Sequence, residues 1–305
     1  MLVQGAFNVL FRPGLRKNFL DDYLLYEPEW SSFLKTGTMD LPEIRATIIT
    51  GFSRLVERFD GEPVTFDTPK AGPVVMGVDR EFALGFALSR KTVEDDQYGK
   101  ANQSSKWLSQ AAQLTQEYRS AALLDDAFAG ATFKGIDNLS LCNNAHTLLN
   151  STSTVANTPG ATAQVGLSVT GISSLLDLGM TCKNENGDPI KINYNKLIIS
   201  NSSGELNKAL QIFGSDKEPF TAENQDNAIK KRIGMIKPEI SRYKSSSKSY
   251  FMIDDRLNDA WFLTKRAVTF DDDFDFFTDA ALYKASTRFL VWFVDWRGWA
   301  GMNPA

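Results

Sequence analysis

The single histidine of this 305-residue chain, His146, is the first residue to test for chemistry. A Ser-His-Asp or Cys-His arrangement would have to use His146 as its base, because the chain offers no other imidazole. No G-x-S-x-G turn is present to supply a nucleophilic serine. The favoured interpretation is a hydrogen-bonded structural histidine, and a hydrolase or lyase that uses His146 is kept as a rival hypothesis.

Metal and nucleotide sites also lack the residue spacing that they need. Cys142, His146 and Cys182 have neither the paired spacing nor the fourth Cys or His of a structural zinc site. The acidic run DDDFD at residues 271–275 could collect calcium, but it lacks the glycine and the glutamate of an EF-hand loop. Neither G-x-G-x-x-G nor G-x-x-x-x-G-K-[ST] occurs, so nucleotide phosphates have no recognisable cradle. We therefore predict no metal, no cofactor and no catalytic residue.

Composition and charge narrow the possible partners. The chain is 43% hydrophobic and 23% charged with a net charge of -4, which is ordinary for a globular protein and lacks the broad basic surface of a protein that grips nucleic acid. Its one basic run, residues 228–249, holds seven Lys or Arg, which are most simply solvated. The longest apolar run, residues 289–294, is far shorter than the about 20 residues that span a bilayer. Two cysteines without a CxxC motif favour a reducing cytoplasm.

The elements that would position any site begin with an irregular N-terminal region. Residues 1–39 show no sustained period, which predicts an extended arm. Asp40, Pro42 and Glu43 are helix-start signals, and apolar residues follow at helical spacing, so a helix is predicted over residues 41–59. From residue 61 the stretches PVTFD and EFALGFALS predict a long hairpin with Lys70 at its tip.

That predicted hairpin carries an apolar face formed by Phe82, Leu84, Phe86 and Leu88. An isolated two-stranded hairpin is marginally stable, so this face is expected to need a partner surface. A Phe86→Asp substitution is accordingly expected to leave the chain folded and to block association.

A long helix is the clearest element of the chain. Apolar residues at helical spacing predict it over residues 99–129, with Trp107, Leu114 and Tyr118 on its buried stripe. Residues 165–250 then alternate between helix and strand patterns, as in an α/β lobe. From residue 251 strands return, and the closing stretch, which holds Trp292 and Trp296, is apolar on both faces and should be covered on both.

This order of elements resembles the major capsid proteins of tailed bacteriophages, the Hong Kong 97-like fold, and within that group the Mu-like major head proteins. Two stretches support the resemblance: SRKTVEDDQYG before the long helix, and GIDNLSLCNNAH after it. In the second stretch relatives commonly have an Asp-Gly turn, whereas this chain reads Asp137-Asn138. The resemblance implies an α+β fold with residues 1–59 as N-terminal arm and helix, 60–94 as extended loop, 95–164 as peripheral domain with its spine helix, 165–250 as axial domain and 251–305 as strands returning to the peripheral domain.

The function implied by the resemblance is assembly rather than turnover. Copies of the chain would form hexamers and pentamers of an icosahedral shell, built in the host cytoplasm, around double-stranded DNA that is contacted weakly and without specificity. Portal, a separate scaffold and decoration proteins would be further partners, and no membrane would be involved. An encapsulin-like compartment around a cargo enzyme is the alternative.

The residues that the resemblance assigns to this assembly fall into two sets. Contacts between subunits through the extended loop and the arm would use Phe82, Leu84, Phe86, Leu88, Lys70, Arg90, Phe11 and Arg12. The core between spine helix and closing strand would use Trp107, Leu114, Tyr118, Trp292 and Trp296. Some shells of this fold carry a Lys-Asn isopeptide link for which Lys70 would be the candidate, but no catalytic acid can be picked out, and we expect no link.

Overall fold

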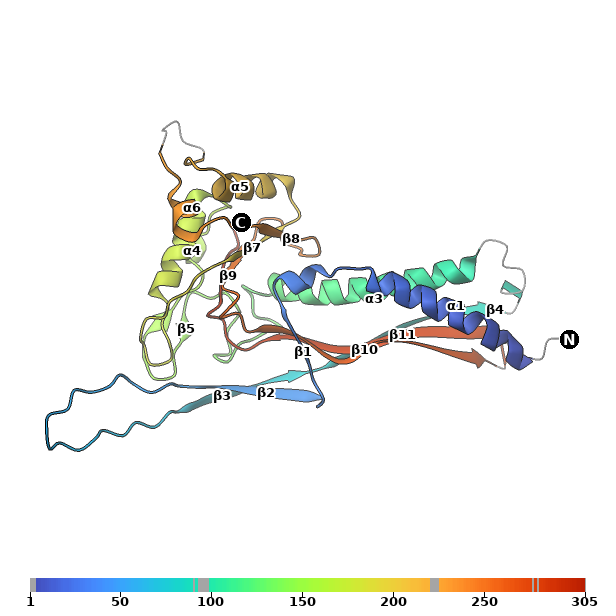
Figure 1. Ribbon diagram of the computed structural model, residues 1–305, viewed down its shortest axis with the longest axis horizontal. Helices are drawn as coiled ribbons and strands as arrows, with labels where there is room; N and C mark the ends of the chain where they lie inside the picture. Colours follow the sequence, from blue (N-terminus) through green and yellow to red (C-terminus); the bar gives the residue numbers. More distant parts are fainter. Residues whose placement is uncertain are drawn as a thin grey trace.

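The computed structural model describes residues 4–89, 91–92, 99–219, 225–275, 277–278 and 280–304, with side chains described from Gly14 onward. Its centre is a four-stranded sheet in the order β1-β10-β11-β4. The strands are β1 (Lys35–Thr38), β4 (Arg80–Ser89), β10 (Ala260–Asp275) and β11 (Ala280–Phe293). The antiparallel pair β10 and β11 forms a long ribbon that gives the molecule its elongated shape (Figure 1).

Two helices lie side by side along one face of this sheet (Figure 1). They are α1 (Gln4–Leu24) and α3 (Lys100–Asp125). The prediction of the long helix is confirmed, but the prediction of an extended arm over residues 1–39 is wrong, because much of that region is helical. Leu15 and Phe19 of α1 are fully buried against α3 and the ribbon, so tertiary packing supplies a stability that the weakly periodic sequence does not announce.

The buried side of α3 differs from the predicted stripe. Trp107 and Tyr118 are each 61% exposed and Leu114 is 43% exposed, so the prediction that these residues form the core with the closing strand is wrong. Because α3 packs against both α1 and the sheet, most of its buried positions hold small or polar side chains: Ala101, Ser105, Ser109, Gln113, Gln116, Glu117, Ser120 and Ala121. The large buried side chains are Leu108, Leu123 and Leu124. The Ser105 hydroxyl, for example, donates to the Leu15 carbonyl at 2.8 Å.

The projecting hairpin is formed earlier in the chain than predicted. Strands β2 (Glu43–Ile49) and β3 (Ala71–Val78) pair antiparallel and carry an irregular loop, residues 50–70, far out from the body (Figure 1). The predicted helix over residues 41–59 is therefore wrong: Ile44, Ala46 and Ile48 alternate in a β-branched stretch, which suits a strand. The prediction of one hairpin over residues 60–94 is also wrong, since β4 joins the central sheet.

Both faces of the closing strand are covered within one chain. On the helical side, Phe289, Val291 and Phe293 enter the main core. On the other side, Leu290 and Trp292 pack under the base of the β2–β3 hairpin. Strand β3 approaches so closely that a Cβ at Gly77 would lie 2.7 Å from Leu290 Cδ2, which explains the glycine there. The base of the β2–β3 hairpin thus covers the second apolar face of β11, whose partner the sequence does not identify.

A second sheet, in the order β12-β9-β7-β8, forms the core of the α/β lobe. Its strands are β7 (Lys196–Ser200), β8 (Pro238–Ser241), β9 (Tyr250–Ile253) and β12 (Trp299–Met302), and helices α4 (Val169–Thr181), α5 (Ser203–Gly214) and α6 (Ala228–Ile233) pack against it. The short strands β5 (His146–Thr147) and β6 (Thr154–Val155) pair nearby. The end of the chain therefore belongs to this lobe, and only β10 and β11 return to the central sheet as predicted for residues 251–305.

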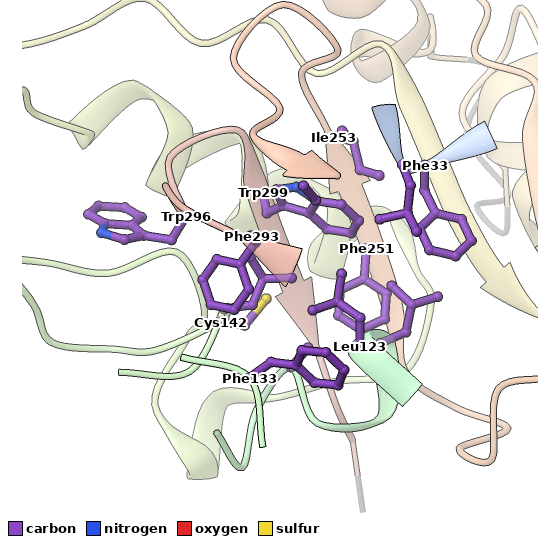
Figure 2. Close-up of a cluster of buried hydrophobic side chains, with 14 of the residues drawn as sticks. Phe33, Leu123, Phe133, Cys142, Phe251, Ile253, Phe293, Trp296 and Trp299 are labelled. Carbon is purple, nitrogen blue, oxygen red and sulfur yellow. The ribbon is translucent and has the colours of Figure 1, made fainter. Parts of the chain in front are cut away.

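The main hydrophobic core lies where the two sheets meet (Figure 2). Figure 2 shows Phe293, Trp296 and Trp299 from the end of the chain gathered with Phe251 of β9 and Leu123 of α3. Trp296 and Trp299 are 1% and 0% exposed, and Trp292 on the opposite face of β11 is 6% exposed. The tryptophan-rich end is thus buried within a single subunit.

Candidate functional site: the projecting loop and its surroundings

His146 is fully buried and has partners on both ring nitrogens. Its Nδ1 lies 2.5 Å from Asp137 Oδ2, and its Nε2 lies 3.2 Å from Asn157 Oδ1. The ring also stacks on Trp296, with centroids 3.9 Å apart and planes 6° from parallel. A substrate cannot reach this imidazole, and neither nitrogen is free to accept a proton from one. The geometry supports the structural interpretation of His146 and argues against the hydrolase or lyase hypothesis.

The turn that carries Asp137 has Asn138 where relatives commonly have glycine. Asn138 has a φ of 61°, the left-handed conformation that glycine adopts freely and that asparagine tolerates better than most residues. Asp137 uses its second carboxylate oxygen to accept from the Leu139 amide at 3.1 Å. The turn therefore keeps the geometry that presents Asp137 to His146.

The other predicted chemical groups do not converge. Cys142 and Cys182 are free and buried, and burial raises the pKa of the Cys142 thiol well above its usual range and that of Cys182 to about 11. Residues 271–275 lie along β10, where successive side chains point to opposite faces and cannot surround one ion. Among the residues that the structure describes, no group of three or more His, Cys, Asp or Glu could hold a metal ion.

The basic run of residues 228–249 is largely neutralised by acids of the same chain. Lys230 pairs with Asp216 at 2.6 Å, and Lys231 pairs with Asp226. Arg232 lies 3.6 Å from Asp177, and Arg242 pairs with Glu29 near the start of the chain. These pairs fold the run back onto the lobe, so it presents no continuous cationic surface for a polyanion.

Lys244 is the buried exception in that run, being 7% exposed. Its ammonium donates to the Ser249 carbonyl and, at 2.8 Å, to the Ser249 hydroxyl, and burial lowers its pKa from 10.5 to about 8. Because the unfolded chain then binds more protons than the folded chain between about pH 8 and 10.5, this group makes the folded state more stable as pH rises through that window.

A Lys244→Met variant should remove that pH dependence. We expect the unfolding free energy of the unmodified chain, minus that of the variant, to rise by more than about 1 kcal/mol between pH 7 and pH 10. Urea denaturation of both proteins at each pH measures the difference. A difference that stays constant across this range would contradict the assignment.

The projecting loop, residues 50–70, exposes the largest concentration of apolar side chains. Six of them are more than half exposed: Phe52, Leu55, Val56, Phe59, Val64 and Phe66. The apolar spacing that predicted a helix over residues 41–59 includes Phe52, Leu55 and Phe59 of this loop. A soluble chain that exposes so many large apolar groups in one segment usually covers them against another molecule.

Polar contacts fix the inner part of the loop to the body. Arg54 pairs with Asp188, and the Asn186 amide donates to the Gly51 and Phe52 carbonyls at 3.1 and 3.2 Å. The Lys70 amide donates to the Thr50 hydroxyl at 2.8 Å, which closes the two ends of the loop. Lys70 therefore lies at the base of the loop, and the predicted position at its tip is wrong.

The remaining residues assigned to subunit contacts occupy different places. Phe82 stacks on Phe289 with centroids 4.8 Å apart, and Phe86 stacks on Tyr283 at 5.1 Å. Leu88 packs in the cluster around α1, whereas Leu84 is 58% exposed. Most of this face thus packs inside its own subunit, which contradicts the expectation that it awaits a partner. Arg90 and the side chains of Phe11 and Arg12 lie outside the described residues.

Comparison with known proteins gives a result at the level of structure only. The sequence matches no protein-family model and no curated protein. Within the residues that the structure describes, no helix combines the length and the apolar character needed to cross a membrane.

Solved structures match over nearly the whole chain. The capsid of the cyanophage P-SCSP1u aligns with a TM-score of 0.58 over 90% of this chain and 88% of its own, at 11% identity. The procapsid of bacteriophage JBD30 aligns with a TM-score of 0.57 over 99% and 77%, at 13% identity. The virus-like particle from Pyrococcus furiosus aligns with a TM-score of 0.51 over 95% and 98%, at 10% identity. The chain therefore has the fold of a viral capsid protein. More specifically, it has the α+β Hong Kong 97-like fold of tailed-phage capsids, as the order of its elements predicted.

Proposed function

We propose that this chain is a major capsid protein that assembles as hexamers and pentamers into an icosahedral shell around packaged double-stranded DNA. The observation that carries the proposal is the projecting loop, whose six apolar side chains remain more than half exposed in the part of the chain that the structure describes. Burying side chains of this kind contributes roughly 1.5–3 kcal/mol each, so covering all six would contribute on the order of 10 kcal/mol before ordering costs.

In this proposal each part of the chain has a role in the shell. The hairpin of residues 43–78 lies across a neighbouring copy, the central sheet with α3 forms the peripheral domain, and the lobe around β7 and β9 meets its copies at the centres of hexamers and pentamers. The chain performs no turnover chemistry, in keeping with the inaccessible His146. Portal, scaffold and decoration proteins are separate partners, contact with DNA is weak, and the shell is built in the host cytoplasm.

Expression of the chain, alone and with a scaffold protein, tests the proposal. We expect closed particles or free capsomers in sedimentation and in negative-stain microscopy. A stable monomer at high concentration under assembly conditions would contradict it. The contents of the particles, nucleic acid or protein, distinguish this function from the alternative, a compartment around a cargo enzyme.

A further inference from the structure

A groove of about 470 Å³ runs beside the junction of β3 and β4. Residues 75–80 form one wall, residues 132–134 and Arg119 of α3 form the other, and β11 forms the floor. Met76 and Val78, each more than half exposed, give the groove its accessible apolar surface, above the buried rings of Phe133 and Trp292. Three cations, Arg80, Arg119 and Lys134, also line it.

These three cations have no acidic partner in the part of the chain that the structure describes. Asp79 also lines the groove, but its carboxylate is 2.7 Å from the guanidinium of Arg288. Arg119 rests on the Phe133 ring, with its guanidinium carbon 4.8 Å from the centroid. Burial and the nearby charge of Arg80 lower the pKa of Arg119. A half-buried arginine beside a second cation is a site that an incoming anion would stabilise.

The tip of the projecting loop carries the complementary groups. Residues 57–62 read Glu-Arg-Phe-Asp-Gly-Glu, with three acids and one base. The tip is a tight turn in which the Glu62 amide donates to the Phe59 carbonyl at 3.2 Å and Gly61 has a φ of 86°. Phe59 is 68% exposed beside Asp60. The tip therefore offers an aromatic ring and carboxylates together, which matches a groove with an apolar wall and three cations.

A chain cannot place its own tip in its own groove. Strand β3 leads from the loop to the groove, and its residues 71–74, which precede the groove wall, span about 13 Å. The loop then continues away from the body (Figure 1). The tip that fits the groove must come from another molecule.

We propose that the groove lined by Arg80, Arg119 and Lys134 receives the loop tip of a second copy of this chain, with Phe59 against the apolar wall and Asp60 and Glu62 on the cations. This inference rests on the proposed assembly function and names the contact that directs it. DNA phosphates would satisfy the same charges, but they offer nothing to the apolar wall, so we favour the loop tip.

A charge-swap experiment tests this docking in the full-length chain. The groove variant carries Arg80→Glu and Lys134→Glu, both at exposed positions, and the tip variant carries Asp60→Lys and Glu62→Lys. We expect each variant alone to raise the protein concentration needed for assembly by about tenfold or more. The chain with all four substitutions should regain most of the original assembly, because opposite charges then face each other again.

Controls separate this docking from folding and from assembly in general. Lys106→Glu, an exposed cation on α3 outside the groove, should assemble like the unmodified chain. Thermal unfolding of unassembled protein verifies that the groove and tip variants are folded. The docking proposal is overturned if the chain with all four substitutions assembles no better than the groove variant or the tip variant. It is also overturned if the groove variant assembles normally and loses only DNA. If the unmodified chain never assembles, the proposed function fails first.

Discussion

Replacing Leu55 and Phe66 by aspartate is expected to abolish particle formation and to leave the unfolding free energy of the subunit within about 0.5 kcal/mol of the original. Both side chains lie on the projecting loop and are at least 92% exposed, so they contribute little to the fold of their own subunit. In a shell the same two residues would be buried in every copy, and a buried carboxylate without a partner is strongly unfavourable. Sedimentation of the assembled fraction and urea denaturation of the monomer measure the two effects separately.

Phe86→Asp is the matched comparison, because it places the same charge on β4. Phe86 stacks on Tyr283 inside the subunit, so this variant should destabilise the monomer by about 3 kcal/mol. The original expectation, a folded chain that cannot assemble, thus moves from Phe86 to the loop. A loop variant that forms normal particles, or one that unfolds like the Phe86 variant, would contradict the role assigned to the loop.

The second large effect is expected at His146. His146→Ala should lower the unfolding free energy by about 3–5 kcal/mol, because it leaves the buried Asp137 carboxylate without its partner and removes the ring stacked on Trp296. Chemical denaturation of the unassembled subunit measures this loss.

Two further variants separate the causes of that loss. His146→Phe keeps a ring against Trp296 but still leaves the carboxylate unpaired. Adding Asp137→Asn to His146→Phe removes the charge and keeps an oxygen for the Leu139 amide, so the double variant should be more stable than His146→Phe alone. A double variant that is less stable would show that the contact with Asp137 is not what the histidine supplies.

The parts of the fold that the sequence predicts well are those whose pattern is decided locally. The long helix was expected over residues 99–129 and spans Lys100–Asp125, and the apolar stretch YNKLIIS contains β7. The first helix was missed, because Leu15 and Phe19 are fixed by α3 and the ribbon rather than by a regular pattern of their own. Strand β2 was read as a helix because start signals and apolar spacing agreed by chance, and its pairing with β3 overrides them.

The side of α3 that is buried could not be predicted from hydrophobicity. Large side chains such as Trp107 were assigned to the core, yet a helix enclosed on two sides has room there for serine and alanine. The cationic groove was missed for a different reason. Arg80, Arg119 and Lys134 are far apart in the sequence, and only the turn after β3 and the end of α3 bring them together.

The crossing from β11 to β12 has a mechanical consequence. Residues 294–298 join the two sheets. Within them, Arg297 pairs with Asp295 at 2.9 Å and with Glu185 at 2.7 Å. The buried rings of Trp296 and Trp299 lie on either side of it in the sequence. A hinge between the sheets would have to break this ion network and expose both tryptophans. The two sheets are therefore held as one rigid unit, whereas the projecting loop is fixed to the body by only a few polar contacts. In a closed shell, differences in curvature between one subunit contact and the next would be accommodated by movement of the loop and not by bending between the two sheets.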